Sequence, residues 1–66
     1  MKDIEKQYAC VFSSQNGKRV LSHLRSVTIE RVFGPNASNE ELRWWAAQCS
    51  LVHQIERLIT KGNNPT

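Results

Sequence analysis

The fold is decided by the stretch SNEELRWWAAQCSLVHQIERLITK, residues 38–61. Ser38, followed three residues later by Glu41, forms a capping box, which is a common start of a helix. Apolar residues then recur at three- and four-residue steps until Lys61 and Gly62, a basic residue and a glycine that indicate the end. We therefore predict one long helix over about residues 39–61.

This helix carries two apolar stripes, because Trp44 and Trp45 are adjacent and point about 100° apart. The first stripe contains Trp44, Leu51, Ile55 and Leu58, with Gln48 in its gap, and the second contains Trp45, Cys49, Val52 and Ile59. A helix that serves one core usually has a single apolar stripe. We expect the second stripe to face the protein's own helices and the first to form a protein interface, although the periodicity also allows the reverse assignment.

Gln48 is the one polar residue inside the first stripe. Either it lies at the margin of a core, with its amide reaching water, or it is a buried amide that fixes the register between packed helices. An unpaired buried amide would be costly. We predict that Gln48 sets register at the interface formed by Trp44, Leu51, Ile55 and Leu58.

The residues before the long helix predict two shorter helices. Ile4, Tyr8 and Val11 follow helical spacing within about residues 3–12. A turn at residues 13–17 follows, and Ser14 is the expected cap of a helix over about residues 15–27. A loop over about residues 28–38 and a polar tail at residues 62–66 complete the chain. The sequence predicts a single all-α domain, residues 1–66, in which the long C-terminal helix is packed by two shorter N-terminal helices.

Length and composition favour an interaction protein. A domain of 66 residues has a core of only marginal stability, so self-association or a large assembly would be a natural support. The net charge of +3 comes from scattered bases and attracts acidic partners only weakly. There is no apolar run long enough for a membrane span and no signal-peptide pattern, so we expect a cytoplasmic protein. Cys10 and Cys49 are then expected to be reduced core residues, although their number also allows one Cys10–Cys49 disulfide.

The sequence contains no convincing catalytic, cofactor-binding or metal-binding pattern. Cys49 and His53 share a helix face, but Cys10 and His23 are thirteen residues apart on different expected helices, unlike the close ligand pairs of zinc sites. A cysteine in the middle of a packed helix lacks the activated thiol that catalysis needs. We expect no enzyme, no cofactor and no metal.

The alternative function is a small nucleic-acid-binding or regulatory protein. Its candidate contacts are the basic residues Lys18, Arg19, Arg25 and Arg31. A helix-turn-helix reading fails on two grounds, because residues 27–37 are too long for the tight turn and the last helix carries apolar residues where polar base contacts are needed.

The chain also resembles a known family. The stretches YACVFSS (residues 8–14) and NGKRVLSHL (residues 16–24) are similar to the front half of small helical proteins encoded in the virion-structure gene modules of tailed phages and prophages. The segments ELR, QCSLV and IERLI, at residues 41–43, 48–52 and 55–59, resemble their back half. Ala47 and Cys49 depart from the family's usual glycine and arginine.

The resemblance implies a phage or prophage protein with no known enzymatic role, whose partners are other virion or assembly proteins. The expected function is therefore a virion-associated or head-assembly accessory protein that binds partners through an apolar helix face. Self-association is a second way to cover that face. The expected location is the cytoplasm of the bacterial host or the virion.

Overall fold

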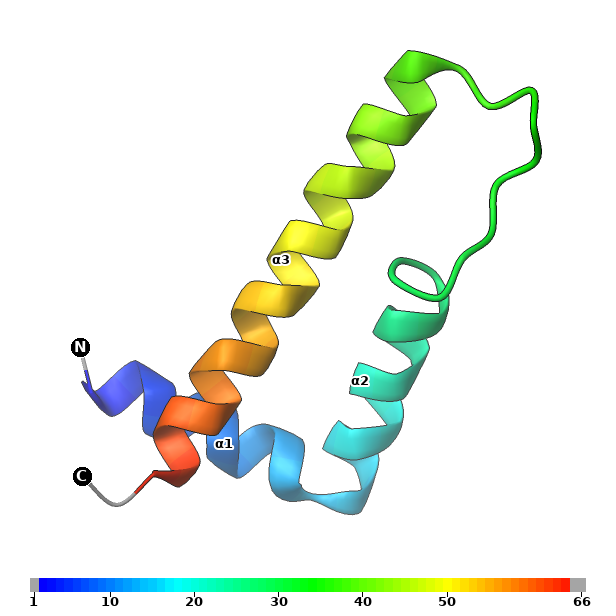
Figure 1. Ribbon diagram of the computed structural model, residues 1–66. Coiled ribbons are helices and arrows are strands. Elements are labelled where there is room, and N and C mark those ends of the chain that lie inside the picture. The colour runs from blue at the N-terminus through cyan, green and yellow to red at the C-terminus, as the bar shows by residue number, and fades with distance from the viewer. Residues whose placement is uncertain (1, 65–66) are drawn as a thin grey trace.

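The structure is a computed structural model that describes residues 2–64, so residues 65–66 of the predicted tail lie outside the described part. It contains three helices, α1 (Lys2–Ser13), α2 (Gln15–Ser26) and α3 (Asn39–Asn63) (Figure 1). The long helix α3 packs mainly against α1, and no strand occurs in residues 2–64. The predicted all-α fold, with one long C-terminal helix and two shorter N-terminal ones, is confirmed.

Serine caps start the second and third helices, as predicted. The side chain of Ser14 accepts a hydrogen bond from the backbone N–H of Gly17 at 3.0 Å, and that of Ser38 accepts one from Glu41 at 3.1 Å. Each cap satisfies a backbone donor that the first helical turn leaves without a partner. Glu40 and Glu41 in the first turn of α3 also complement the positive end of the helix dipole.

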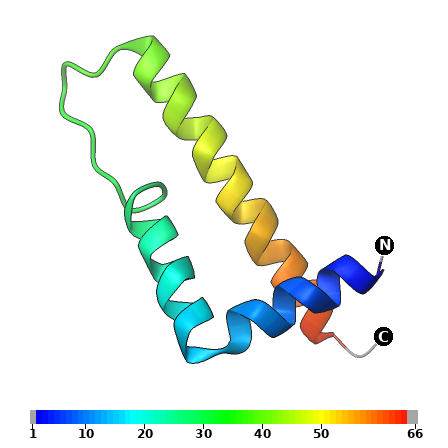
Figure 2. The ribbon, with the colours of Figure 1, turned by 180° about the vertical axis from the view of Figure 1, so that it is seen from behind.

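The two ends of the described chain meet where α1 crosses the C-terminal part of α3 (Figures 1 and 2). Gly62 lies at this crossing, and a Cβ atom added to it would be 2.1 Å from the backbone oxygen of Glu5 and 2.8 Å from the Cβ of Ala9. The sequence prediction that Gly62 ends the long helix is wrong, because α3 continues to Asn63. This glycine instead lets two helix backbones approach closely.

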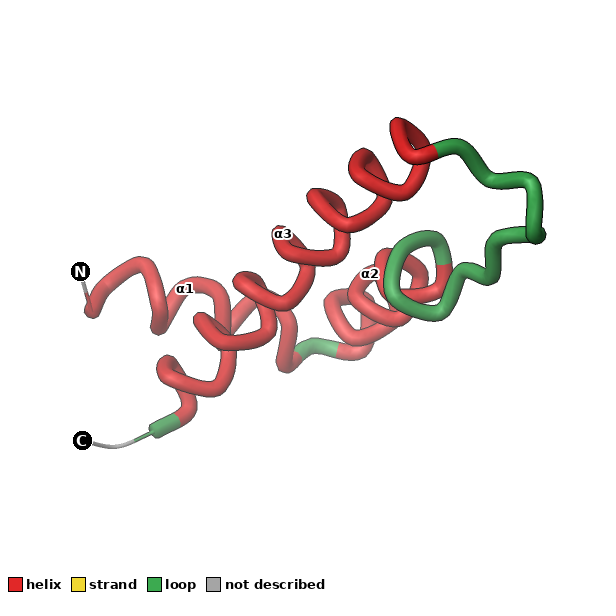
Figure 3. Tube along the Cα trace, turned by 45° about the horizontal axis from the view of Figure 1, so that its top comes forward, coloured by secondary structure: helices red, strands yellow, loops and turns green. Residues whose placement is uncertain are grey.

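A second glycine has the same role between α1 and α2. Gly17 is buried, and a Cβ atom there would be 2.0 Å from the backbone oxygen of Val11. The chain therefore folds back sharply after α1, and Figure 3 shows the very short connection between the two helices. A side chain at this position would force α2 away from α1.

The segment between α2 and α3 is held at one point. After α2 the chain forms a turn over residues 27–30 and then a loop that reaches the start of α3 (Figure 3). Thr28 is buried, and its hydroxyl donates to the backbone oxygen of Leu24 at 2.6 Å. The indole N–H of Trp45 donates to the backbone oxygen of Thr28, and the Trp45 ring meets Phe33 edge-on at 5.4 Å. This cluster fastens the loop to α3.

The molecule is elongated and has a small hydrophobic core. Its radius of gyration is 14.1 Å, whereas a compact chain of this length would have about 11 Å. The extents are 45 × 24 × 13 Å, and the thin dimension leaves room for at most two stacked helices, whose axes would be about 8–10 Å apart. Ala9 and Val52 are the hydrophobic residues of the described part with less than a tenth of their surface exposed. The helices therefore leave much apolar surface uncovered.

Candidate interaction surface on the long helix

The first apolar stripe of α3 extends farther than the sequence prediction and follows a heptad pattern. We define the α3 seam by the positions that follow one another at steps of four and three residues, which are Trp44, Gln48, Leu51, Ile55, Leu58 and Gly62. Such a 4-3 repeat keeps the residues on one face of a helix, as in the contact line of a coiled coil. The predicted interface residues Trp44, Gln48, Leu51, Ile55 and Leu58 all belong to this seam.

The two halves of the α3 seam differ in exposure. In the C-terminal half, Ile55, Leu58 and Gly62 are half-buried, and α1 crosses the seam at Gly62. In the N-terminal half, Trp44 is 56% exposed and Leu51 is 59% exposed. Helix α1 therefore covers only one half of a continuous apolar face.

The second stripe lies toward the interior. Val52 is 3% exposed, while Cys49 and Ile59 are half-buried. Trp45 packs on Phe33 of the loop, and not on the first two helices as its place in the second stripe predicts. The second stripe thus contains Val52, the buried residue of α3, whereas Trp44 of the first stripe lies outside.

Gln48 lies on the seam between Trp44 and Leu51. It is half-buried, and its amide remains accessible to solvent, since no buried side-chain nitrogen or oxygen lacks a partner within residues 2–64. A polar residue at one seam position is a common device for fixing register and partner number between helices. Its amide is free to pair with a group from outside the chain.

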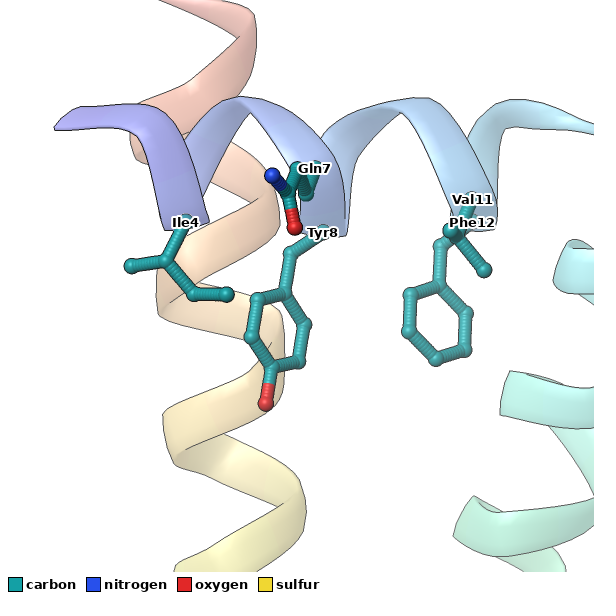
Figure 4. A pocket seen from close by; sticks show the side chains of 5 residues that line it. All are labelled: Ile4, Gln7, Tyr8, Val11 and Phe12. Carbon is teal, nitrogen blue, oxygen red and sulfur yellow. The ribbon is translucent and has the colours of Figure 1, made fainter.

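A flank of α1 continues the apolar surface. Ile4, Tyr8 and Phe12 project from one side of α1, and Figure 4 shows them pointing the same way, along the direction in which α3 runs back toward its start. The Tyr8 and Phe12 rings stack at 6.3 Å, and the notch that they line has a volume of about 270 Å³. Since its lining comes from α1 alone, the notch is an open ledge beside the seam.

The predicted nucleic-acid contacts do not act as four unpaired cations. The Arg25 guanidinium donates to the Glu56 carboxylate of α3 and also lies 3.6 Å from the Glu30 carboxylate. The hydrogen bond to Glu56, followed by the attraction of its charge, raises the pKa of Arg25 above its usual value. Arg31 lies over the Phe33 ring at 4.8 Å. Lys18 and Arg19 remain exposed on α2. Arg25 thus joins α2 to α3, and its charge is paired with carboxylates of the chain and not available for a phosphate group.

The cysteines and histidines are dispersed. Cys10 is exposed, so its predicted place in the core is wrong, and Cys49 is half-buried. Both are free thiols. Residues 2–64 contain no group of three or more Cys, His, Asp or Glu side chains that could hold a metal ion. Across the same residues, no helix is long and apolar enough to cross a membrane.

The fold and its surface define a small all-α protein with an incomplete core and an uncovered apolar helix face. Residues 8–61 match the family model described as Bbp19-like phage protein. The chain belongs to this family and is therefore a small phage-encoded protein. Neither a curated protein nor a solved structure matches it.

Proposed function

We propose that this phage protein is a protein-interaction module, an accessory of the phage head or of its assembly, and that it binds its partners through the uncovered half of the α3 seam. The observation that carries the proposal is the exposure of Trp44 and Leu51 on a seam whose other half is covered by α1. Single exposed apolar residues are ordinary on protein surfaces. Here they are aligned on one helix face together with a polar register residue.

The energetics favour a partner. A tryptophan side chain buries a large apolar area with few rotors to freeze, which makes it a frequent anchor of protein interfaces. Removing Trp44 and Leu51 from water would stabilise a complex by about 25 cal/mol for each Å² of apolar surface that the partner covers. A 66-residue chain buries little apolar surface by itself, so this contribution is large relative to its own stability.

The head assignment is the more specific part of the proposal. Family membership establishes a phage protein, and the similarity of residues 8–14 and 16–24 to proteins from virion-structure gene modules supports a place in the particle or its assembly. Phage structural or assembly proteins, a second copy of this chain included, are the candidate partners. Nucleic acid is disfavoured, because Arg25 is paired with Glu56.

The test is carried out in a phage that carries the gene. Leu51→Ser removes an apolar contact from the seam, and Val20→Ser is the matched control, since Val20 is 53% exposed on α2 and lies off the seam. We expect Leu51→Ser to lower the yield of complete particles at least tenfold, while Val20→Ser leaves it unchanged. Mass spectrometry of purified particles and electron microscopy of lysates locate the defect. Equal particle yields for both variants, with both proteins folded and present at normal levels, would contradict the proposal.

A further inference from the structure

We infer that the uncovered half of the α3 seam is covered by a second copy of this chain, and that the two α3 helices pair antiparallel about a two-fold axis near Gln48. The inference rests on the proposed function, because it assigns an occupant to the same surface. Four properties of the structure lead to it. They are the length of the uncovered half, the position of α1, the charges at the start of α3 and the excess of exposed area.

The length of the uncovered half determines where the two-fold axis crosses α3. It runs from the start of α3 at Asn39 to about Ile55, where the part covered by α1 begins. Sixteen residues of helix span about 24 Å. When two identical stretches pair antiparallel over their full length, their midpoints coincide, here at Ala47, next to the seam residue Gln48. A two-fold axis at this point brings the two Gln48 amides face to face, and each can donate to and accept from the other.

The position of α1 excludes a parallel pair. Helix α1 lies across the C-terminal half of the seam, at Gly62. In a parallel dimer, both α1 helices would stand between the two C-terminal halves and hold them apart. In the antiparallel dimer, each uncovered half meets the other, and each α1 lies beyond the start of the partner's α3. The ledge formed by Ile4, Tyr8 and Phe12 then faces that start (Figure 4).

The charges favour the same direction. Glu40 and Glu41 occupy the first turn of α3. A parallel pair would bring four carboxylates together and align two helix dipoles side by side, which is unfavourable. The antiparallel arrangement separates the two acidic ends by the length of the interface.

The exposed area is sufficient for a dimer. The chain exposes 5360 Å², whereas a compact monomer of 7.6 kDa would expose about 4,300 Å². The excess of about 1,100 Å² exceeds the roughly 800 Å² that each partner buries in an interface of standard size. Covering the seam and the ledge with a second copy would thus restore the surface of a compact protein. A dimer with closed two-fold symmetry also uses up this surface on both copies, so no further copy is added.

The first experiment determines the solution mass of the unmodified protein by sedimentation equilibrium over a wide concentration range. We expect the mass of a dimer, which falls to that of a monomer on dilution. Leu51→Ser should weaken the dimer at least tenfold, whereas Val20→Ser should not. A monomer at every concentration overturns the inference, and it leaves the proposed function to be judged by the particle yields of the Leu51→Ser phage.

The second experiment determines the direction of pairing by disulfide cross-linking in a Cys10→Ser, Cys49→Ser background. Gln48→Cys should cross-link between copies, because the axis brings the two positions together. Trp44→Cys should not, because Trp44 lies four residues before the axis and the two Trp44 positions are then about 12 Å apart along the helix, too far for a disulfide. Ser50→Cys, on the opposite face, is the control for random collision. Cross-linking at both Trp44 and Gln48, or at neither, would contradict the antiparallel arrangement.

Discussion

The two halves of α3 contain the same kind of residues but have different surroundings. In the C-terminal half, α1 crosses at Gly62, and Ile55 and Leu58 lose much of their exposure. In the N-terminal half, the seam residues Trp44 and Leu51 are more than half exposed, although the loop fastens the neighbouring Trp45. One helix therefore stabilises the monomer with one half and offers an apolar surface with the other. The heptad seam therefore continues beyond the part of α3 that the chain itself can cover.

The largest effect is expected at the crossing of α1 and α3. Gly62→Ala places a Cβ atom 2.1 Å from the backbone oxygen of Glu5, so α1 must move. We expect a loss of about 1–3 kcal/mol of unfolding free energy from this overpacking, although alanine alone would favour the helix by about 1 kcal/mol. Chemical denaturation followed by circular dichroism measures the change. A domain of this size has a total stability of about 3–5 kcal/mol, so much of the fold would be lost.

Gly34→Ala is the matched control for that substitution. No atom lies within 4 Å of the Cβ that it adds, so the unfolding free energy should stay near that of the wild type. If Gly62→Ala were more stable than the wild type, helix propensity would dominate, and the close crossing described for the C-terminal half would be wrong.

The two tryptophans give the sharpest contrast within the N-terminal half. Trp45→Ala removes the edge contact with Phe33 and the hydrogen bond to Thr28, and should cost about 2–4 kcal/mol. Trp44→Ala removes an exposed side chain and should change the stability of the dilute monomer by less than about 1 kcal/mol, while association weakens. Denaturation at high dilution and sedimentation at high concentration measure the two effects. Equal losses of stability would remove the distinction between an inner and an outer stripe.

A smaller effect is expected where α2 meets α3. Glu56→Gln removes the charge that pairs with Arg25, so α2 should open more often while the crossing of α1 and α3 persists. Hydrogen exchange read by mass spectrometry should show faster exchange in α2 and unchanged exchange in α1. High salt should reduce the difference between wild type and variant, because it screens the exposed part of the pair. Uniformly faster exchange would indicate that α2 is an integral part of a single cooperative core.

The smallest effect is expected from metal removal. Cys10, His23, Cys49 and His53 are not brought together as a ligand set in the described residues. Addition of a chelator should therefore leave the helix content unchanged by circular dichroism. A structural zinc site would behave differently, because its loss unfolds small domains. Loss of helix on chelation, reversed by zinc, would show that both halves of α3 depend on a ligand.

Much of the long helix could be predicted from the sequence. Its start follows from Ser38 and Glu41, whose capping contact is local, and its two stripes follow from the helical period. The role of Gly62 could not be predicted, because a glycine near the end of a helix fits both a stop signal and a close crossing. Only the position of Glu5, far away in the sequence, decides between the two.

The contacts that hold the rest of the molecule are also nonlocal. Arg25 and Glu56 are 31 residues apart, and the bond from Trp45 to Thr28 depends on the path of the loop. The sequence predicts Cys10 in the core because cysteine is often buried, but its neighbour Ala9 is the buried residue at the crossing with α3, and Cys10 is exposed. The apolar stripes of the sequence predict which residues are candidates for the interaction surface. The crossing of α1 decides which half of the seam remains uncovered.

We expect Trp44 to be exposed in the monomer and to become covered by association. This change in exposure is tested most directly by fluorescence of the Trp45→Phe variant, in which Trp44 is the one remaining tryptophan and an aromatic ring is kept at position 45. We expect red-shifted emission and efficient acrylamide quenching at high dilution, followed by a blue shift and at least a several-fold loss of quenching as the concentration rises. Protected emission at the highest dilution would place Trp44 in the core of the monomer. Unchanged, fully quenchable emission at every concentration would show that no second copy covers the seam, and either result would contradict the account.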